Sequence, residues 1–390
     1  MLGFCREISS LKILSMKAKV NIYSAGRFHV LDLARELSKL GYDVKFYSFV
    51  PEKRAMFFGL PRVCSVSLLL PLFPFVFLER KLFPHKRWAN HLRVLVQDYL
   101  TSIIARPSEI TIAMSGEFIH SIRKAKCNGS IIIVERGSKH IVEQKRILES
   151  IPSLRGKCPV PTFNYSRELE CYKIADYVSV ASSHVVKSFL ENGFDVKKIF
   201  RNPYGVDLSM FKTLPNIQKE YDVLFVGAWS YQKGCDLTIA AIKKTNLRFL
   251  HVGGINDIDF PKDDERFTHI DKVDQSELIN YYNKAKIFLI PSRQEGLAMV
   301  QAQAIACNLP VVGSSNSGIE DLQDMVASPD MITIIKEYTP DAVLEAINIG
   351  LRKYECLNGE KYAGEAIENL TWEAYGKRYD AFLRSILNED

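Results

Sequence analysis

The sequence predicts an α/β protein built from two domains, each with a parallel sheet. At 390 residues the chain exceeds the usual size of one domain. In both halves short apolar runs alternate with amphipathic stretches, a pattern typical of parallel α/β sheets. Residues 202–207, Asn-Pro-Tyr-Gly-Val-Asp, are rich in turn formers and separate the two series. We therefore expect a hinge at this segment.

The elements of the first half follow from apolar periodicity and helix stop signals. A strand at 20–24 precedes an amphipathic helix at 30–40, which Gly41 ends. Further strands are predicted at 44–49, 110–114, 131–135 and 177–180, and a helix at 182–191 follows the last of them.

The second half repeats this arrangement. Strands are predicted at 222–227, 248–252, 287–290 and 311–313, and a final helix at 371–387. The helix before the last strand starts near Leu297, and Asn308 stops it while Pro310 prevents its continuation.

One loop of the second half combines a carboxylate with a helix start. Residues 291–296, Pro-Ser-Arg-Gln-Glu-Gly, deliver Glu295 to the carboxyl end of a buried strand, where open α/β sheets bind ligands. The freed amides of Leu297, Ala298 and Met299 favour an anion such as a diphosphate. A carboxylate beside an anion site suggests a ligand with both phosphate and hydroxyl groups.

This loop carries a family resemblance. Pro-Ser at 291–292, Glu295-Gly296 and Asn-Leu-Pro-Val-Val at 308–312 resemble the donor-binding element of glycosyltransferase family 4, retaining enzymes with the GT-B fold. The resemblance implies two facing Rossmann-like domains with a cleft between them and a C-terminal helix that crosses back. We expect residues 1–205 to form the acceptor-side domain, residues 206–370 to bind the nucleotide-sugar, and residues 371–390 to pack on the first domain.

The resemblance also implies roles for two side chains of this element. Glu295 matches the glutamate that holds the donor sugar. Gln303 stands where the family has a glutamate for the ribose, and its amide still donates and accepts hydrogen bonds, without charge. Eight residues of helix advance about 12 Å, a plausible span between the sugar and the ribose of one donor.

A second loop, after the strand at 222–227, belongs to the same implied donor site. Lys233 matches a family lysine that faces the donor diphosphate, and Gly227 ends the strand. Ala228 replaces the arginine of the family, which removes a bidentate phosphate ligand. The alternative interpretation of Lys233 is a solvated loop lysine, and we favour phosphate contact.

Two loops of the first half are candidates for the opposite side of the cleft. Gly26 follows the first strand, and the resemblance favours contact with the donor phosphate over a simple tight turn. Arg136 and His140 follow the strand at 131–135, in the loop where the family often has a histidine that reaches the sugar. Both are catalytic candidates, although a charged loop is more often only surface.

The first half is basic. Residues 1–200 carry a net charge of +14 and residues 201–390 one of −8. An apolar, aromatic run at 66–78 is followed by basic residues, and this block is predicted to contact a membrane surface or the acceptor. The alternative is a buried strand followed by a basic helix. The candidate contacts are Arg80, Lys81, Lys86, Arg87 and Trp88.

The sequence contains no motif for several other kinds of functional site. The eight cysteines include no C-x-x-C pair, and no phosphate-binding G-x-x-x-x-G-K, H-E-x-x-H or nucleophile elbow occurs. The Asp-Ile-Asp at 257–259 lies in a polar loop, and we interpret it as solvated. We therefore expect no metal, no cofactor beyond the nucleotide-sugar co-substrate, and no nucleic-acid partner. A cytoplasmic protein, peripheral at the inner face of a membrane, is the expectation.

The function predicted from the resemblance is transfer of a hexose-like sugar, with retention, from a nucleotide diphosphate sugar. The acceptor would be a hydroxyl of a lipid-linked or polysaccharide precursor in cell-envelope glycan synthesis. Two alternatives stay open: a nucleotide-sugar epimerase on the same fold, and a degenerate module that binds partners without catalysis. Ala228 and Gln303 favour the degenerate module, and the intact Glu295-Gly296 loop with Lys233 argues against it.

Overall fold

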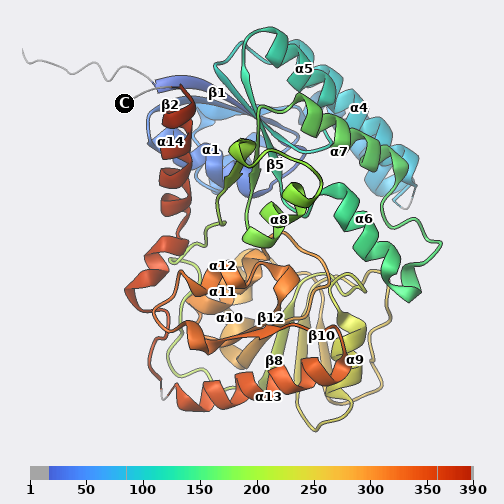
Figure 1. Ribbon diagram of the computed structural model, residues 1–390, viewed down its shortest axis with the longest axis vertical. Coiled ribbons are helices and arrows are strands. Elements are labelled where there is room, and N and C mark those ends of the chain that lie inside the picture. The colour runs from blue at the N-terminus through green and yellow to red at the C-terminus, as the bar shows by residue number, and fades with distance from the viewer. Residues whose placement is uncertain (1–16, 85, 358, 388–390) are drawn as a thin grey trace, which may run out of the picture.

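The computed structural model describes residues 17–84, 86–357 and 359–387. These residues form two parallel sheets, one in each half of the elongated molecule, with helices packed on their faces (Figure 1). The two-domain α/β prediction is confirmed.

The N-terminal sheet has seven parallel strands in the order β3-β2-β1-β4-β5-β6-β7. Its strands are β1 (Lys17–Tyr23), β2 (Tyr42–Ser48), β3 (Ser65–Ser67), β4 (Ile110–Met114), β5 (Ile131–Arg136), β6 (Tyr177–Val180) and β7 (Ile199–Arg201). The direction of strand order reverses between β1 and β4.

The C-terminal sheet has six parallel strands in the order β10-β9-β8-β11-β12-β13. Its strands are β8 (Tyr221–Val226), β9 (Phe249–Val252), β10 (Phe267–Ile270), β11 (Ala285–Ile290), β12 (Val311–Ser314) and β13 (Ile332–Ile335). Strand order reverses between β8 and β11, so the loops after these two strands flank the position where such sheets bind ligands.

Most helices connect strands, whereas the last two follow the final strand β13. The helices are α1 (His29–Lys39), α2 (Glu52–Phe57), α3 (Leu69–Phe77), α4 (Arg87–Ile104), α5 (Ile119–Cys127), α6 (Ile141–Ser150), α7 (Thr162–Ile174), α8 (Ser183–Glu191), α9 (Cys235–Ile242), α10 (Gln275–Lys284), α11 (Met299–Ala306), α12 (Glu320–Gln323), α13 (Pro340–Cys356) and α14 (Trp372–Leu387). The helix expected to start near Leu297 begins at Met299, two residues later.

All nine central strands were predicted from the sequence, and the four edge strands were not. β3, β7, β10 and β13 lie at the sheet edges and contain only three or four residues. An edge strand is covered on fewer sides, so its apolar pattern is short and weak. The block at 66–78 is not the buried strand of the alternative interpretation. After the short β3 it is mainly the helix α3, followed by a π-helical turn at Leu78–Leu82.

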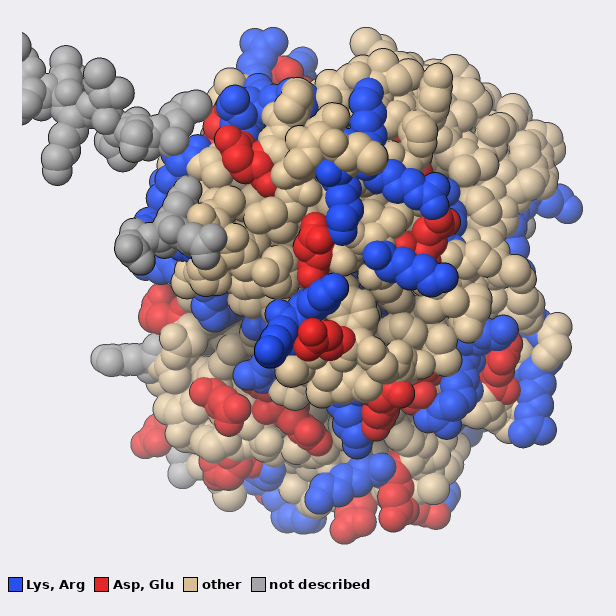
Figure 2. All heavy atoms as spheres, turned by 45° about the horizontal axis from the view of Figure 1, so that its top comes forward, with Lys and Arg blue, Asp and Glu red and all other residues tan. Residues whose placement is uncertain are grey.

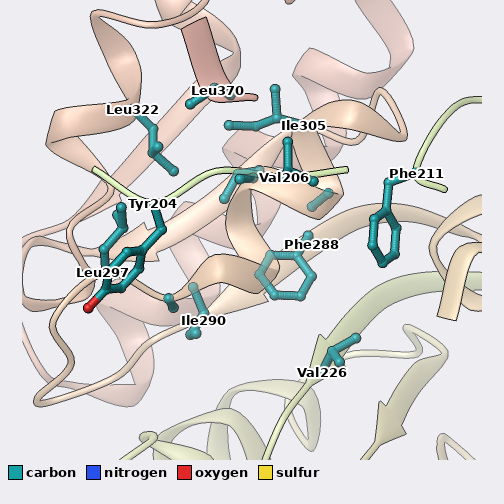
Figure 3. Close-up of a cluster of buried hydrophobic side chains, with 14 of the residues drawn as sticks. Tyr204, Val206, Phe211, Val226, Phe288, Ile290, Leu297, Ile305, Leu322 and Leu370 are labelled. Carbon is teal, nitrogen blue, oxygen red and sulfur yellow. The ribbon is translucent and has the colours of Figure 1, made fainter. Parts of the chain in front are cut away.

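The predicted hinge joins the domains and meets the last helix. Gly205 is required there, because a Cβ atom would lie 2.6 Å from the Trp372 backbone nitrogen. Arg378 of α14 donates from Nε to the Asn202 side chain at 2.7 Å. Figure 3 shows Val206 of the linker among apolar side chains of the C-terminal domain, within one continuous core.

Helix α14 crosses back to the N-terminal domain, as expected, and packs beside α1 (Figure 1). Asp380 accepts hydrogen bonds from Lys17 at 2.7 Å and from the Tyr42 hydroxyl at 2.8 Å. The buried Tyr379 hydroxyl donates to Glu135 of β5 at 2.8 Å. These contacts tie α14 to the sheet that forms one wall of the cleft.

Candidate active site

The carboxylate of Glu295 and the ammonium of Lys233 form an ion pair at the carboxyl edge of the C-terminal sheet. Both side chains are largely but not fully buried. A Cβ atom at Gly227 would lie 3.9 Å from Cε of Lys233, so the lysine also lies beside the end of β8. The structure therefore brings together three residues predicted for the donor site.

Backbone geometry explains how two loops meet at this pair. Gly234 has φ +73°, and a Cβ atom there would overlap the carbonyl of Pro291. Glycine therefore allows the Lys233 loop to pack on the loop at 291–296, which we call the donor loop. Arg293 then fixes the contact with a bidentate ion pair to Asp236 at 2.6 and 2.7 Å. Because its guanidinium is engaged there, Arg293 does not replace the arginine missing at Ala228.

The helix start after Gly296 offers fewer amides than predicted. The Ala298 amide donates to the Ser317 carbonyl at 3.2 Å. Among the residues that the structure describes, the amides of Leu297 and Met299 have no such partner. These two remain available for an anion at the start of α11.

Gln303 lines a cavity of about 260 Å³ between the domains. Its Oε1 accepts a hydrogen bond from the buried Tyr282 hydroxyl at 2.9 Å, which orients the side chain and leaves the amide nitrogen as a donor. Met299 lines the same cavity, and Arg27 and His29 of the N-terminal domain form its opposite side. The cavity is an interdomain cleft at the position predicted for the ribose.

Gly26 lies in the loop after β1, next to that cleft. A Cβ atom there would make only ordinary contacts, 3.8 Å from the Phe49 ring at the nearest. The backbone therefore does not itself require glycine at this position, and contact with a donor phosphate stays a prediction.

Arg136 and His140 are both buried inside the N-terminal domain. The Arg136 guanidinium donates to Glu168, to Gln144 and to the Lys139 carbonyl. His140 packs against the rings of Tyr172 and Phe189, and burial lowers the pKa of its imidazole to about 4.

The loop between Arg136 and His140 touches the donor loop directly. A Cβ atom at Gly296 would overlap the Gly137 carbonyl, and Nε2 of the Gln294 side chain donates to the Ser138 hydroxyl. Arg136 and His140 therefore brace a loop that meets the Glu295 loop across the cleft.

Sequence reasoning missed a second contact across the cleft, made by the start of α8. The Ser182 hydroxyl donates to the Gly296 carbonyl at 2.7 Å, and His184 Nε2 donates to the Glu295 carbonyl at 3.1 Å. Burial lowers the pKa of His184 to about 4, so its imidazole is neutral at pH 7. Asp321 of α12 accepts hydrogen bonds from the Ser183 amide, 2.9 Å from each carboxylate oxygen.

These interdomain residues carry no sequence motif. A serine and a histidine at a helix start suggest a cap as readily as a contact with another domain. Only the placement of one domain against the other reveals their partners.

The described part of the chain bears on the membrane and metal predictions through its helices, its potential metal ligands and its exposed basic residues. Among its helices, none is long and apolar enough to cross a bilayer. Its histidine, cysteine and acidic side chains form no group of three suited to a metal ion. Asp257 accepts a hydrogen bond from the Tyr231 amide at 2.9 Å. The candidate membrane contacts Arg80, Lys81, Lys86, Arg87 and Trp88 are all exposed.

The chain is similar to a protein family, to individual relatives in sequence and to solved structures. Residues 220–352 match the family described as "Glycosyl transferases group 1". One component of the phosphatidylinositol N-acetylglucosaminyltransferase of Arabidopsis thaliana is 25% identical over 259 residues, 60% of this chain and 55% of that protein. D-inositol 3-phosphate glycosyltransferase of Segniliparus rotundus is 26% identical over 265 residues, 60% of this chain and 58% of that protein. The chain thus matches little more than half the length of these relatives.

Solved structures share the fold over nearly the whole chain. HepE of Anabaena, in complex with UDP and glucose, has a TM-score of 0.65 at 13% identity, covering 95% of this chain and 100% of that one. Sucrose-phosphate synthase of Thermosynechococcus elongatus has a TM-score of 0.63 at 15% identity, covering 96% and 100%.

Proposed function

We propose that this protein, which belongs to the group 1 glycosyltransferases and has the GT-B fold, transfers a sugar from a nucleoside diphosphate donor to an acceptor hydroxyl. The observation that carries the proposal is the Lys233–Glu295 ion pair at the switch point between β8 and β11. A cation and a carboxylate side by side suit a ligand that presents phosphate and hydroxyl groups together.

Each group of the site has a task in this reaction. Lys233 stabilises the departing diphosphate, assisted by the amides of Leu297 and Met299. Glu295 accepts hydrogen bonds from the sugar hydroxyls and orients the ring. Gln303, with its amide nitrogen free to donate, holds the ribose in the interdomain cleft. Donor binding replaces the direct Lys233–Glu295 contact with a contact between Lys233 and the phosphate oxygens.

The proposed chemistry is a front-face displacement with retention, in which the departing phosphate assists deprotonation of the acceptor hydroxyl. The protein then mainly positions groups and stabilises charge. Closure of the domains on Ser138, Ser182 and His184 keeps water from the donor. Arg136 and His140 act here by holding the loop that closes, because their side chains are buried in the N-terminal domain.

For the acceptor we propose a hydroxyl of a lipid-linked or polysaccharide precursor, as in cell-envelope glycan synthesis. The charge of +14 in residues 1–200 supports a phosphate-bearing acceptor. The names of two relatives, a phosphatidylinositol N-acetylglucosaminyltransferase component and a D-inositol 3-phosphate glycosyltransferase, also support a phosphate-bearing acceptor.

Product analysis tests the proposed reaction against its alternatives. The purified protein is incubated with UDP-, GDP-, ADP- and CDP-sugars, with and without a lipid extract as acceptor. We expect a new glycosylated lipid or glycan with retained anomeric configuration by NMR, formed only when the acceptor is present. Conversion of the donor sugar to an epimer without acceptor would instead identify an epimerase.

A further inference from the structure

The outer surface of α4 is apolar while its inner surface is polar. Trp88, Leu95, Tyr99 and Ile103 share the outer surface at helical spacing and are all exposed, Tyr99 to 58%. After Arg87 the only charged side chains of α4 are Arg93 and Asp98, and both are buried. A helix on the surface of a soluble protein normally has the opposite arrangement.

The buried charges of α4 are held by specific partners. Arg93 donates to Glu79 at 2.6 Å and to Gln97 at 2.9 Å. Asp98 accepts hydrogen bonds from the Ser121 amide at 2.9 Å and from Arg167 at 2.8 Å. The inverted arrangement is therefore built into the domain by hydrogen bonds to both buried charges, and the apolar surface is left facing outward.

Helix α3 packs beside α4 and extends this surface. Leu70 is 87% exposed and Phe73 57%, and Phe77 follows one helical turn later. No charged residue occurs between Arg62 and Glu79. Figure 2 shows a broad area with few charged side chains at its upper right, on the side of the N-terminal domain where Figure 1 places α4.

Basic side chains border this surface where α3 ends and α4 begins. Arg80, Lys81, Lys86 and Arg87 are exposed, and within the described residues none of them pairs with an acidic side chain. Phe83 and Trp88 lie among them with ring centroids 5.1 Å apart. Aromatic rings beside such cations are suited to the headgroup layer of a membrane, where phosphates lie next to apolar chains.

We propose that the α3–α4 surface, defined by the exposed apolar residues of these helices and their basic border, docks on an anionic lipid bilayer. The nine-residue α3 contains Pro74 and is too short to span, so the contact is interfacial. A second copy of the chain fits less well, because a two-fold contact through this surface would bring the same cations together.

The surface adjoins the acceptor side of the cleft. The Arg80 and Arg93 guanidinium groups lie 5.5 and 5.3 Å from the centre of the Phe49 ring. Phe49 in turn is the nearest neighbour of a Cβ atom at Gly26, and Gln97 of α4 donates to the Ser24 carbonyl at 3.0 Å. Docking would thus hold the cleft next to the bilayer. The docking of this surface on a bilayer does not depend on the proposed function. The further idea that the acceptor is a lipid-linked molecule in that bilayer rests on the proposed function.

Vesicle flotation without nucleotide tests the docking. The full chain is mixed with vesicles of phosphatidylcholine alone or with about 30% phosphatidylglycerol, alongside Phe73→Ser/Phe77→Ser, Leu95→Ser/Tyr99→Ser and Lys81→Gln/Lys86→Gln. Val196→Ser, which alters an exposed apolar residue outside α3 and α4, is the control. We expect binding to the anionic vesicles that falls at least about tenfold in each double apolar variant. In Lys81→Gln/Lys86→Gln, the loss of each lysine should weaken binding to the anionic vesicles about fivefold at low salt.

Other outcomes would overturn the proposal. Binding to neither vesicle, by protein shown to be folded, excludes a membrane partner. Concentration-dependent dimers that the apolar variants abolish, without vesicle binding, assign the surface to a second copy. Glu295→Gln should still float with the vesicles, so a failure of docking and a failure of the proposed transfer are separable.

Discussion

Glu295→Gln should lower the rate of sugar transfer by about 10²-fold while the protein stays folded. The substitution keeps the size of the side chain but removes the charge that orients the sugar hydroxyls and balances Lys233. Loss of the group that positions a reacting sugar costs on the order of 10²-fold in turnover, because a displacement of about 1 Å is enough to do so. The measurement is kcat with the donor and acceptor identified by product analysis, together with the melting temperature of the variant.

A matched control separates this effect from general loss of negative charge. Glu345 lies exposed on α13, and this helix lies at the end of the C-terminal domain away from the N-terminal domain (Figure 1), so Glu345→Gln should leave turnover unchanged. Equal activity of Glu295→Gln and wild type would remove Glu295 from the site.

Tyr379→Ala should reduce the free energy of unfolding by about 3–5 kcal/mol, the usual cost of removing a buried aromatic side chain. The Tyr379 ring is fully buried against Phe200, and its hydroxyl donates to Glu135. Tyr379→Phe should cost about 1–3 kcal/mol, because it leaves one oxygen of the buried Glu135 carboxylate without its donor. Urea unfolding followed by circular dichroism gives both values.

Tyr99→Ala on the outer surface of α4 serves as the comparison, with an expected change within about 0.5 kcal/mol. If Tyr379→Ala cost no more than this exposed substitution, Tyr379 would not anchor α14 to the N-terminal domain.

The central strands and the donor loop could be predicted because their signals are local. An all-apolar run such as Ile287 to Ile290 indicates a strand buried on both faces, and the turn after it fixes where Glu295 emerges. Lys233 was found through its match to the family's lysine, and the local pattern only placed its loop between a strand and a helix.

The remaining features depend on tertiary packing and have no local signal. Ser182 and His184 contact the donor loop only because the domains close on each other. The Ala298 amide was expected to be free, but the loop at Ser317 folds back to accept its hydrogen bond. From the sequence, the polar side of α4 likewise indicates an ordinary exposed helix surface. In the structure Arg93 and Asp98 on that side are buried.

The central claim is that a nucleoside diphosphate binds at Lys233, beside Glu295. A thermal-shift panel of UDP, GDP, ADP and CDP with their sugar derivatives tests it most directly, on wild type, Lys233→Ala and the exposed control Lys336→Ala. We predict that one nucleotide stabilises wild type and the control, by about 2.7 kcal/mol at about 100 times its dissociation constant, and that Lys233→Ala loses most of this effect. Folded wild-type protein that no nucleotide stabilises would contradict the claim and favour a binding module without catalysis.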